Sequence, residues 1–365
     1  MNIDLSTLSA AERLTLFLRA LYESRGYCLF SMNRLEEYSL YVENMNFLQS
    51  RDIIVFSDLD GRLMALKPDI TLSIAKSING DSASLEKLYY HENVFRAAPH
   101  AREYREIPQT GLECIGAVTD YDLAETLYLA QRTLGAIDEN YVLDVSHLGF
   151  VSAVMEAAGA DGALCEKLLS ALRRKAPHEL ERAAKKGGLS GEASEKLARL
   201  AAVSGDFEST LAEAETLCSG RKAKAALKAL HNICAPLDQT RLRLDFSIVS
   251  DMQYYNGVVF QGYVQKVPNP VLFGGQYDLL LEKMGKTGKK AVGFALYLDG
   301  IGRGYGEPRA LPPRATVLYD EGEDPGRVFA AVNAEAAKGL SVRAVTDPND
   351  ILGTLIDIRK GEKNA

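Results

Sequence analysis

The chain contains no tryptophan, and its five cysteines and five histidines show none of the spacings that metal sites require. No Cys-x-x-Cys, His-x-x-x-His or His-Glu-x-x-His pattern occurs, which argues against a structural zinc site and against a disulfide framework. We therefore expect no bound metal, and reduced, mostly buried thiols of the kind found in cytosolic proteins. The cysteines are Cys28, Cys114, Cys165, Cys218 and Cys234.

The sequence also lacks a long apolar run and an excess of positive charge. No stretch of about 18 apolar residues occurs, and residues 1–13, which include Asp4 and Glu12, form no apolar leader. Lysine and arginine number 42 against 49 acidic residues, a formal charge of −7, so no basic field is available to collect phosphates. We expect a cytoplasmic protein that binds neither a membrane nor nucleic acid.

What the chain does have is the composition of a globular protein, with 47% hydrophobic and 25% charged residues. Ser9 and Glu12 form a capping-box pattern that predicts an amphipathic helix ending at Gly26. The Asp-Gly pair at 60 and 61 stands between two apolar runs and predicts a hairpin over 52–66. Further strands are expected at 27–30, 87–95, 103–115, 141–145, 242–248, 258–264 and 291–296, and a further helix at 121–134.

Residues 148–235 differ from the rest, because alanine, lysine, glutamate and leucine dominate and aromatic residues almost vanish. This composition is typical of an inserted helical subdomain. Strand patterns stand on both sides of it, so we expect one core built from 1–147 and 236–309. A Leu-Pro-Pro stretch then leads into a short α/β segment, 310–365, with roughly one strand, a helix and a further strand. The expected fold class is α+β.

One polar face of the strand at 103–115 is the first candidate for a binding site. Residues of equal parity share a face of a strand, which brings Arg105, Gln109, Gly111 and Glu113 to one side. Such a row suits the floor of a pocket that grips a small zwitterion. An exposed polar sheet face explains the same pattern equally well.

Two other segments carry features of a binding site. Tyr254 and Tyr255 stand at the start of an apolar strand, followed by Asn256-Gly257, which is compatible with a left-handed kink. Tyrosines at this place are more often the edge of a core than a ligand site. Gly274-Gly275 precedes Tyr277 and permits either a close approach of the backbone or a simple turn.

As a set and in this order, these segments resemble the histidyl branch of the class II aminoacyl-tRNA synthetases over approximately residues 8–305. The resemblance implies that family's antiparallel sheet flanked by helices. The matching segments are Lys67-Pro68-Asp69-Ile70-Thr71, Phe95-Arg96, Gln109-Thr110-Gly111-Leu112-Glu113, Tyr254-Tyr255-Asn256-Gly257, Gly274-Gly275-Gln276-Tyr277-Asp278 and the strand from Ala291 to Asp299.

The resemblance also implies roles for eight residues of a histidine pocket. It assigns Asp69, Thr71 and Gln109 to the α-amino end of a bound histidine, Glu113 and Tyr255 to its imidazole, and Tyr254 and Tyr277 to the walls that close the pocket. Arg96 resembles the motif 2 arginine that contacts the α-phosphate of ATP. Carboxylates and hydroxyls are the acceptors that an ammonium group prefers.

Departures from the family pattern concern ATP rather than the amino acid. Ser250 replaces the histidine-specific arginine, Met252-Gln253 replaces a Leu-Asp pair, and Gly300 stands where the arginine that stacks on adenine belongs, with Arg303 one helical turn further on. Ala97 and Ala98 replace polar residues of the ATP loop, and no proline occurs in 27–50, where motif 1 carries one. Because adenylyl transfer depends on preorganised cations, we expect adenylation to be close to abolished.

A synthetase-like core without the ATP and tRNA machinery resembles the regulatory subunits of the short-form ATP phosphoribosyltransferase. This resemblance implies a non-catalytic protein without a cofactor, which pairs with a separate catalytic subunit and responds to L-histidine as an allosteric effector. It also implies a homo-oligomer, at least a dimer, and makes 310–365 a truncated remnant of the anticodon-binding domain. Two alternatives stay open: a histidine–tRNA ligase, and an orphan class II paralogue that acts on another substrate.

Overall fold

A computed structural model describes residues 8–48, 53–78, 84–98, 103–218, 220–249, 254–305 and 314–359. By their contacts the residues divide into two compact units, 1–306 and 307–365, each of which is described by itself. Within the described residues, no helix is both long and apolar enough to cross a membrane.

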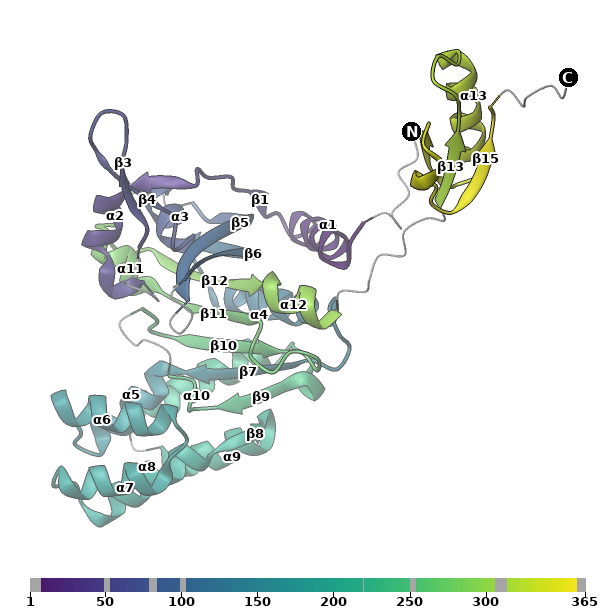
Figure 1. Cartoon of the computed structure of the whole chain (residues 1–365). Coiled ribbons are helices and arrows are strands. Elements are labelled where there is room, and N and C mark those ends of the chain that lie inside the picture. Colours follow the sequence, from purple (N-terminus) through teal and green to yellow (C-terminus); the bar gives the residue numbers. More distant parts are fainter. Residues whose placement is uncertain are drawn as a thin grey trace, which may run out of the picture. The chain divides into compact units, whose positions relative to one another are not determined.

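The first unit is organised around a nine-stranded sheet with the order β1-β5-β6-β12-β11-β10-β7-β9-β8 (Figure 1). Neighbouring strands are antiparallel except in the pairs β1–β5 and β7–β9, which are parallel. The expected α+β fold, a large sheet flanked by helices, is therefore confirmed, although the sheet is mixed and not purely antiparallel. The strands are β1 Cys28–Leu29, β5 Glu86–Ala98, β6 Glu103–Gly116, β7 Val142–His147, β8 Ser204–Asp206, β9 Leu242–Asp245, β10 Val258–Tyr263, β11 Leu272–Gln276 and β12 Lys290–Tyr297.

The N-terminal part follows the sequence pattern closely. Helix α1, Ala10–Glu23, begins with the expected capping box, in which the Ser9 hydroxyl accepts from the Glu12 amide while the Glu12 carboxylate accepts from the Ser9 amide. The expected hairpin is formed by β3, Val55–Ser57, and β4, Leu63–Leu66. Gly61 adopts φ +80° in its turn, a left-handed conformation that glycine accepts at no steric cost. Helix α2, Tyr38–Glu43, strand β2, Leu35–Glu37, and helix α3, Thr71–Ser77, complete this part.

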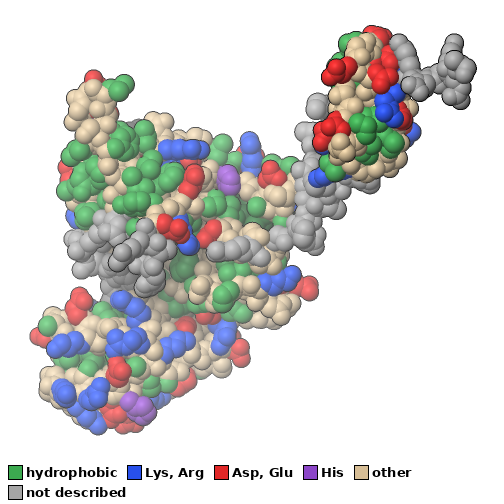
Figure 2. Space-filling model, in the orientation of Figure 1, with side chains coloured by type: hydrophobic (Ala, Val, Ile, Leu, Met, Phe, Trp, Pro, Cys, Tyr) green, Lys and Arg blue, Asp and Glu red, His purple; other side chains and the backbone are tan. Residues whose placement is uncertain are grey.

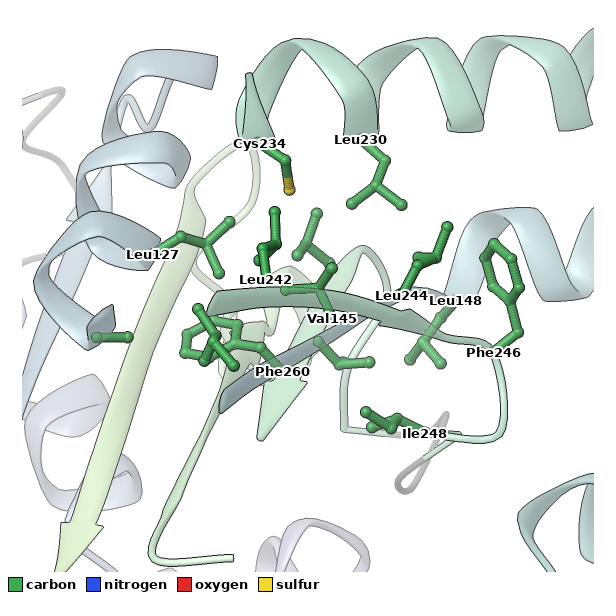
Figure 3. Packing of buried hydrophobic residues seen from close by; sticks show 14 of the residues in the cluster. Leu127, Val145, Leu148, Leu230, Cys234, Leu242, Leu244, Phe246, Ile248 and Phe260 are labelled. Carbon is green, nitrogen blue, oxygen red and sulfur yellow. The ribbon is translucent and has the colours of Figure 1, made fainter. Parts of the chain in front are cut away.

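Helices cover one face of the sheet, and the main hydrophobic core lies between these helices and the sheet. Figure 3 shows residues of helices α4 (Asp120–Gly135), α5 (Leu148–Ala157) and α10 (Arg221–Cys234) directed toward β7, β9 and β10. Alternation along the strands decides which side chains enter this core, since Leu143 and Val145 of β7 are fully buried in it. The residues labelled in the figure are Leu127, Val145, Leu148, Leu230, Cys234, Leu242, Leu244, Phe246, Ile248 and Phe260.

The segment 148–235 is helical, as its composition predicts. Besides α5 and α10 it contains α6 (Gly162–Arg173), α7 (Pro177–Lys186), α8 (Gly191–Ala202) and α9 (Phe207–Leu217). It also supplies β8, which pairs with β9 at the edge of the large sheet. The segment therefore shares the unit 1–306 with the sheet, and its treatment as a separate subdomain bounded at 147 and 236 stays a prediction.

The second unit is a small α/β structure. Strands β13 (Arg314–Leu318), β14 (Ser341–Val345) and β15 (Thr354–Asp357) form a parallel sheet in the order β14-β13-β15, with helix α13 (Pro325–Ala336) between the first two in sequence. The structure thus contains one strand more than the two that the sequence indicates. Most residues of the short β15 are exposed.

Candidate functional site

All eight predicted site residues line a single cavity on the face of the sheet opposite the main core. Gln109 and Glu113 come from β6 and Arg96 from β5, while Asp69 and Thr71 lie at the start of α3. Tyr254 and Tyr255 precede β10, and Tyr277 precedes helix α11, Asp278–Lys283. The remaining lining residues are Phe47, Leu48, Ile70, Tyr90, Phe273, Gly293, Phe294, Ala295 and Tyr297.

The carboxyl group of Glu113 is a buried part of the lining of this cavity. Its Oε1 accepts a hydrogen bond from the Thr71 hydroxyl at 2.7 Å, and its Oε2 accepts one from the Tyr277 hydroxyl at 2.5 Å. Burial raises the pKa of the Glu113 carboxyl from 4.5 to about 8; the two hydroxyl donors lower it and the nearby Asp69 raises it further. A Cβ atom at Gly293 would stand 1.9 Å from Glu113 Oε2, so the glycine makes room for the carboxyl group.

Asp69 and Arg96 form a second polar group in the cavity. The Asp69 carboxylate caps helix α3 by accepting from the Leu72 amide at 2.9 Å. Burial raises the pKa of Asp69, and the Arg96 guanidinium, 3.9 Å from its Oδ2, opposes that shift. Arg96 itself donates to the Pro68 carbonyl at 2.8 Å and to the Tyr297 hydroxyl at 3.0 Å. Its charge is thus committed to neighbouring protein groups.

Gln109 offers a donor that the protein does not use. The side chain is 2% exposed, and its Nε2 finds no hydrogen-bond partner among the described residues. A buried amide without a partner costs free energy, on the order of 1–3 kcal/mol. Because Gln109 lines the cavity, an oxygen atom of a ligand is the partner that would remove this cost.

Three tyrosines form an aromatic wall of the cavity. The rings of Tyr254 and Tyr255 lie 4.5 Å apart between centroids, and those of Tyr254 and Tyr277 lie 5.7 Å apart. Edge-to-face and tilted contacts of this kind give a rigid apolar surface with polar hydroxyl ends. Phe47 extends the wall, 6.0 Å from the Tyr254 ring.

The glycines at 274 and 275 lie within strand β11 and not in a turn. A Cβ atom at Gly275 would stand 2.6 Å from the Tyr255 ring, and one at Gly274 would stand 2.4 Å from the Phe260 ring. The close approach of neighbouring groups, one of the two interpretations that the sequence allows, is therefore correct. It lets the Tyr255 ring pack directly on the sheet.

Two details of the sequence analysis are wrong. Gly257 does not adopt a positive φ, so Asn256-Gly257 makes no left-handed kink; a Cβ atom there would stand 2.1 Å from the Gln276 side chain. Arg105 does not join Gln109 and Glu113 in the cavity, because it lies on the exposed outer end of β6 and pairs with Glu103 at 2.9 Å. The parity argument holds only along the inner half of the strand.

Tyr297 and Phe273 are lining residues that the sequence analysis missed. Tyr297 stands opposite Gln109 in the pairing of β12 with β6, which puts both side chains on the cavity face. The alternation Gly293, Ala295 and Tyr297 along β12 was a usable signal, since all three line the cavity.

The departures from the synthetase pattern are partly visible. Gly300 lies in helix α12, Leu298–Tyr305, where a Cβ atom would stand 3.3 Å from Val267. Ser250, Met252, Gln253, and the side chains of Ala98 and Arg303 lie outside the described residues. Among the residues that the structure does describe, no three His, Cys, Asp or Glu side chains are grouped to hold a metal ion.

Comparison with known proteins gives a consistent family. A model of the histidyl-tRNA synthetase family matches residues 3–301. An ATP phosphoribosyltransferase regulatory subunit from Shouchella clausii is 30% identical over 335 residues, which cover 89% of this chain and 84% of the relative. The regulatory subunit from Moorella thermoacetica is 32% identical over 320 residues, covering 79% and 81%.

Solved structures show the same fold. A regulatory subunit/histidyl-tRNA synthetase from Bacillus halodurans superposes with a TM-score of 0.80 at 24% identity, covering 96% of this chain and 94% of that one. A histidyl-tRNA synthetase from Nostoc sp. gives 0.70 at 17% identity, covering 95% and 87%. With these comparisons and the cavity geometry together, the chain belongs to the histidyl-tRNA synthetase family and, within it, to the ATP phosphoribosyltransferase regulatory subunits.

Proposed function

We propose that the chain is a non-catalytic subunit that binds L-histidine in the cavity around Glu113 and relays feedback inhibition to a separate catalytic subunit of ATP phosphoribosyltransferase. Through this inhibition the chain would control the rate of the first step of histidine biosynthesis in the cytoplasm. The relatives from Shouchella clausii and Moorella thermoacetica carry the name of this regulatory subunit. A chain of an ATP phosphoribosyl transferase complex from Thermotoga maritima shares the fold, with a TM-score of 0.62 at 18% identity.

The observation that carries the proposal is the distribution of polar groups in the cavity. A zwitterion with an imidazole needs acceptors at its ammonium end, a donor for its carboxylate, and polar contacts for its ring nitrogens. The Asp69 carboxylate can accept at the first place, and Glu113 with Tyr255 can meet the ring. The resemblance assigns Gln109 to the ammonium end, but its Nε2, which has no partner among the described residues, can donate to the carboxylate instead. The aromatic wall supplies the apolar surroundings that such pockets use.

The contacts of the cationic side chain in the cavity support a non-catalytic role. Arg96 is the only lysine or arginine among the cavity residues that the structure describes, and Tyr297, Pro68 and Asp69 already engage it. Phosphoryl and adenylyl transfer need cations aimed at the phosphates. An Arg96 engaged in this way is poorly placed for that task, and Gly300 supplies no second cation.

A homo-oligomer is supported by apolar side chains exposed on the N-terminal part. They gather over α2 and the β3–β4 hairpin, where Figure 2 shows many hydrophobic side chains. Leu59 at the hairpin tip is fully exposed, and half of the surface of Leu63 is exposed. Contiguous patches of this kind mark protein interfaces, and we assign this one to a second copy of the chain. The exposed residues are Leu35, Val42, Val55, Phe56, Leu59 and Leu63.

The test combines the chain with the catalytic subunit encoded by the same organism. We expect complex formation by size-exclusion chromatography, a higher transferase rate in the complex than for the catalytic subunit alone, and inhibition by L-histidine that requires this chain. Histidine-dependent pyrophosphate exchange with ATP at a synthetase-like rate would instead support the ligase. A thermal-shift panel in which another amino acid, and not histidine, stabilises the chain would support the orphan paralogue.

A further inference from the structure

Two neighbouring cavities share two lining residues. The first is the predicted amino-acid site around Glu113. The second lies between the loop 266–271 and helix α12, where Gly300 and Gly304 line it. Phe273 and Tyr297 belong to the lining of both, so these two rings form the wall between them.

The Tyr297 ring is held in this wall from three directions. Its backbone is fixed at the end of β12, opposite Gln109 of β6. Its ring meets the Phe273 ring edge to face, with centroids 5.4 Å apart and planes at 79°. Its hydroxyl accepts from Arg96 Nη1 at 3.0 Å, and the guanidinium carbon lies 5.8 Å from the ring centroid. Contacts of this number keep a side chain in one orientation.

The same contacts decide what the pocket can accept beyond an amino acid. A ligand that continues from the carboxyl end of the amino acid toward the second cavity must pass the Phe273–Tyr297 wall. An anionic group at that point would need Arg96, whose guanidinium is engaged by Tyr297 and by the Pro68 carbonyl. To pass, the ligand would have to displace the tyrosine ring and break a charge-assisted hydrogen bond of Arg96.

We propose that Tyr297 is a specificity-determining residue that confines the site to a free amino acid and excludes amino acids carrying a nucleotide on their carboxyl group. The inference rests on the proposed function, since it takes the Glu113 cavity as an amino-acid site. By this proposal a single side chain, Tyr297, decides whether the pocket binds only the free amino acid or also its activated form.

Isothermal titration calorimetry on the full chain tests this. The probes are L-histidine and the non-hydrolysable sulfamoyl analogue of histidyl adenylate, and the proteins are wild type, Tyr297→Ala and Tyr297→Phe. We expect the ratio of analogue affinity to histidine affinity to rise at least about tenfold in Tyr297→Ala, because the two cavities then join. The phenylalanine variant keeps the ring and loses only the hydroxyl that engages Arg96, so its ratio should lie between those of the wild type and Tyr297→Ala.

Phe273→Ala removes the other half of the wall and keeps the inference testable if Tyr297→Ala does not fold, which thermal unfolding will reveal. Equal ratios in wild type and in both alanine variants would overturn the role of the wall. A wild type that binds no histidine would contradict the effector proposal alone, provided that an alanine variant gains the analogue. If no protein binds either probe, both proposals fail.

Discussion

The hydroxyl of Tyr277 donates a 2.5 Å hydrogen bond to the carboxyl group of Glu113, although 164 positions separate the two residues in the chain. Thr71, at the start of α3, donates to the other oxygen of the same group. One buried carboxyl thus ties together β6, α3 and the segment that precedes α11. Burial raises the pKa of this carboxyl, and no lysine or arginine contacts it among the described residues, so its ionisation is coupled to the stability of the fold.

The first prediction concerns stability against pH. The pKa of Glu113 is about 8 in the folded chain and 4.5 in its ordinary state, so between these values the folded state retains a proton that the unfolded state releases. Its contribution to stability is complete below pH 4.5 and is lost as the pH rises toward 8. The loss amounts to at most roughly 5 kcal/mol at 1.36 kcal/mol per pKa unit.

The measurement is urea unfolding of wild type and Glu113→Gln between about pH 4 and about pH 9, the range in which the group titrates. Other groups titrate in this range as well, including Asp144, whose pKa burial raises to about 6. Their effect cancels in the difference between the two proteins. We expect that difference to change in favour of the variant as the pH rises; a difference independent of pH would contradict the assignment.

The second prediction tests Asp69 as the acceptor for an ammonium group. Asp69→Asn keeps an oxygen that can accept from the Leu72 amide, so α3 keeps its cap while the negative charge is removed. Hydrogen bonds to charged groups contribute about 1.5–3 kcal/mol, so histidine affinity should fall about 10- to 100-fold. Arg105→Ala, a change at the exposed end of β6, is the matched control and should leave calorimetric affinity unaltered. Equal affinities in all three proteins would remove Asp69 from the site.

Local sequence patterns predict part of this site, but they do not predict the contacts that depend on strand pairing. Parity along one strand correctly joins Gln109 with Glu113, because alternation is a local property. The same rule wrongly adds Arg105, since it cannot indicate where the strand leaves the covered part of the sheet. Tyr297 lies 201 positions from Arg96, and only the pairing of β12 with β6 and of β6 with β5 brings the two together.

The pair Gly274-Gly275 shows the same limit of local sequence patterns. A Gly-Gly pair predicts a turn and a close approach equally well, and the strand pairing decides between them. Gly275 is paired with Val259 of β10 and with Gly293 of β12, deep within the sheet. The family resemblance, which covers the whole set of motifs, identifies the fold where these local patterns leave alternatives.

The third prediction follows from Gly275. An alanine there would put its Cβ 2.6 Å from the Tyr255 ring and 2.9 Å from the Val258 carbonyl, so the ring has to move off the sheet. Overpacking of this kind costs typically about 1–3 kcal/mol, and histidine affinity should fall with it. Gly191→Ala is the control, because no atom lies within 4 Å of the added carbon. Thermal unfolding and calorimetry check both; an unchanged Gly275→Ala protein would mean that Tyr255 does not pack as described.

The last prediction asks whether the missing arginines alone would account for the absence of adenylation that the proposed function implies. Removing one preorganised donor from an active site typically costs about 100- to 1000-fold in rate. If cations were the only deficit, Ser250→Arg combined with Gly300→Arg should raise histidine-dependent pyrophosphate exchange with ATP by orders of magnitude. We expect a gain of less than about tenfold. A Cβ atom at Gly300 would stand 3.3 Å from the Val267 side chain, so that side chain has to shift to admit an arginine, and Tyr297 still holds Arg96. Gly302→Arg, at a position of α12 with no atom within 4 Å, controls for added charge.

A large gain in the double variant would show that the wall at Tyr297 is no barrier to the adenylate. A gain that appears only after Tyr297→Ala is added to the double variant would assign the barrier to that ring.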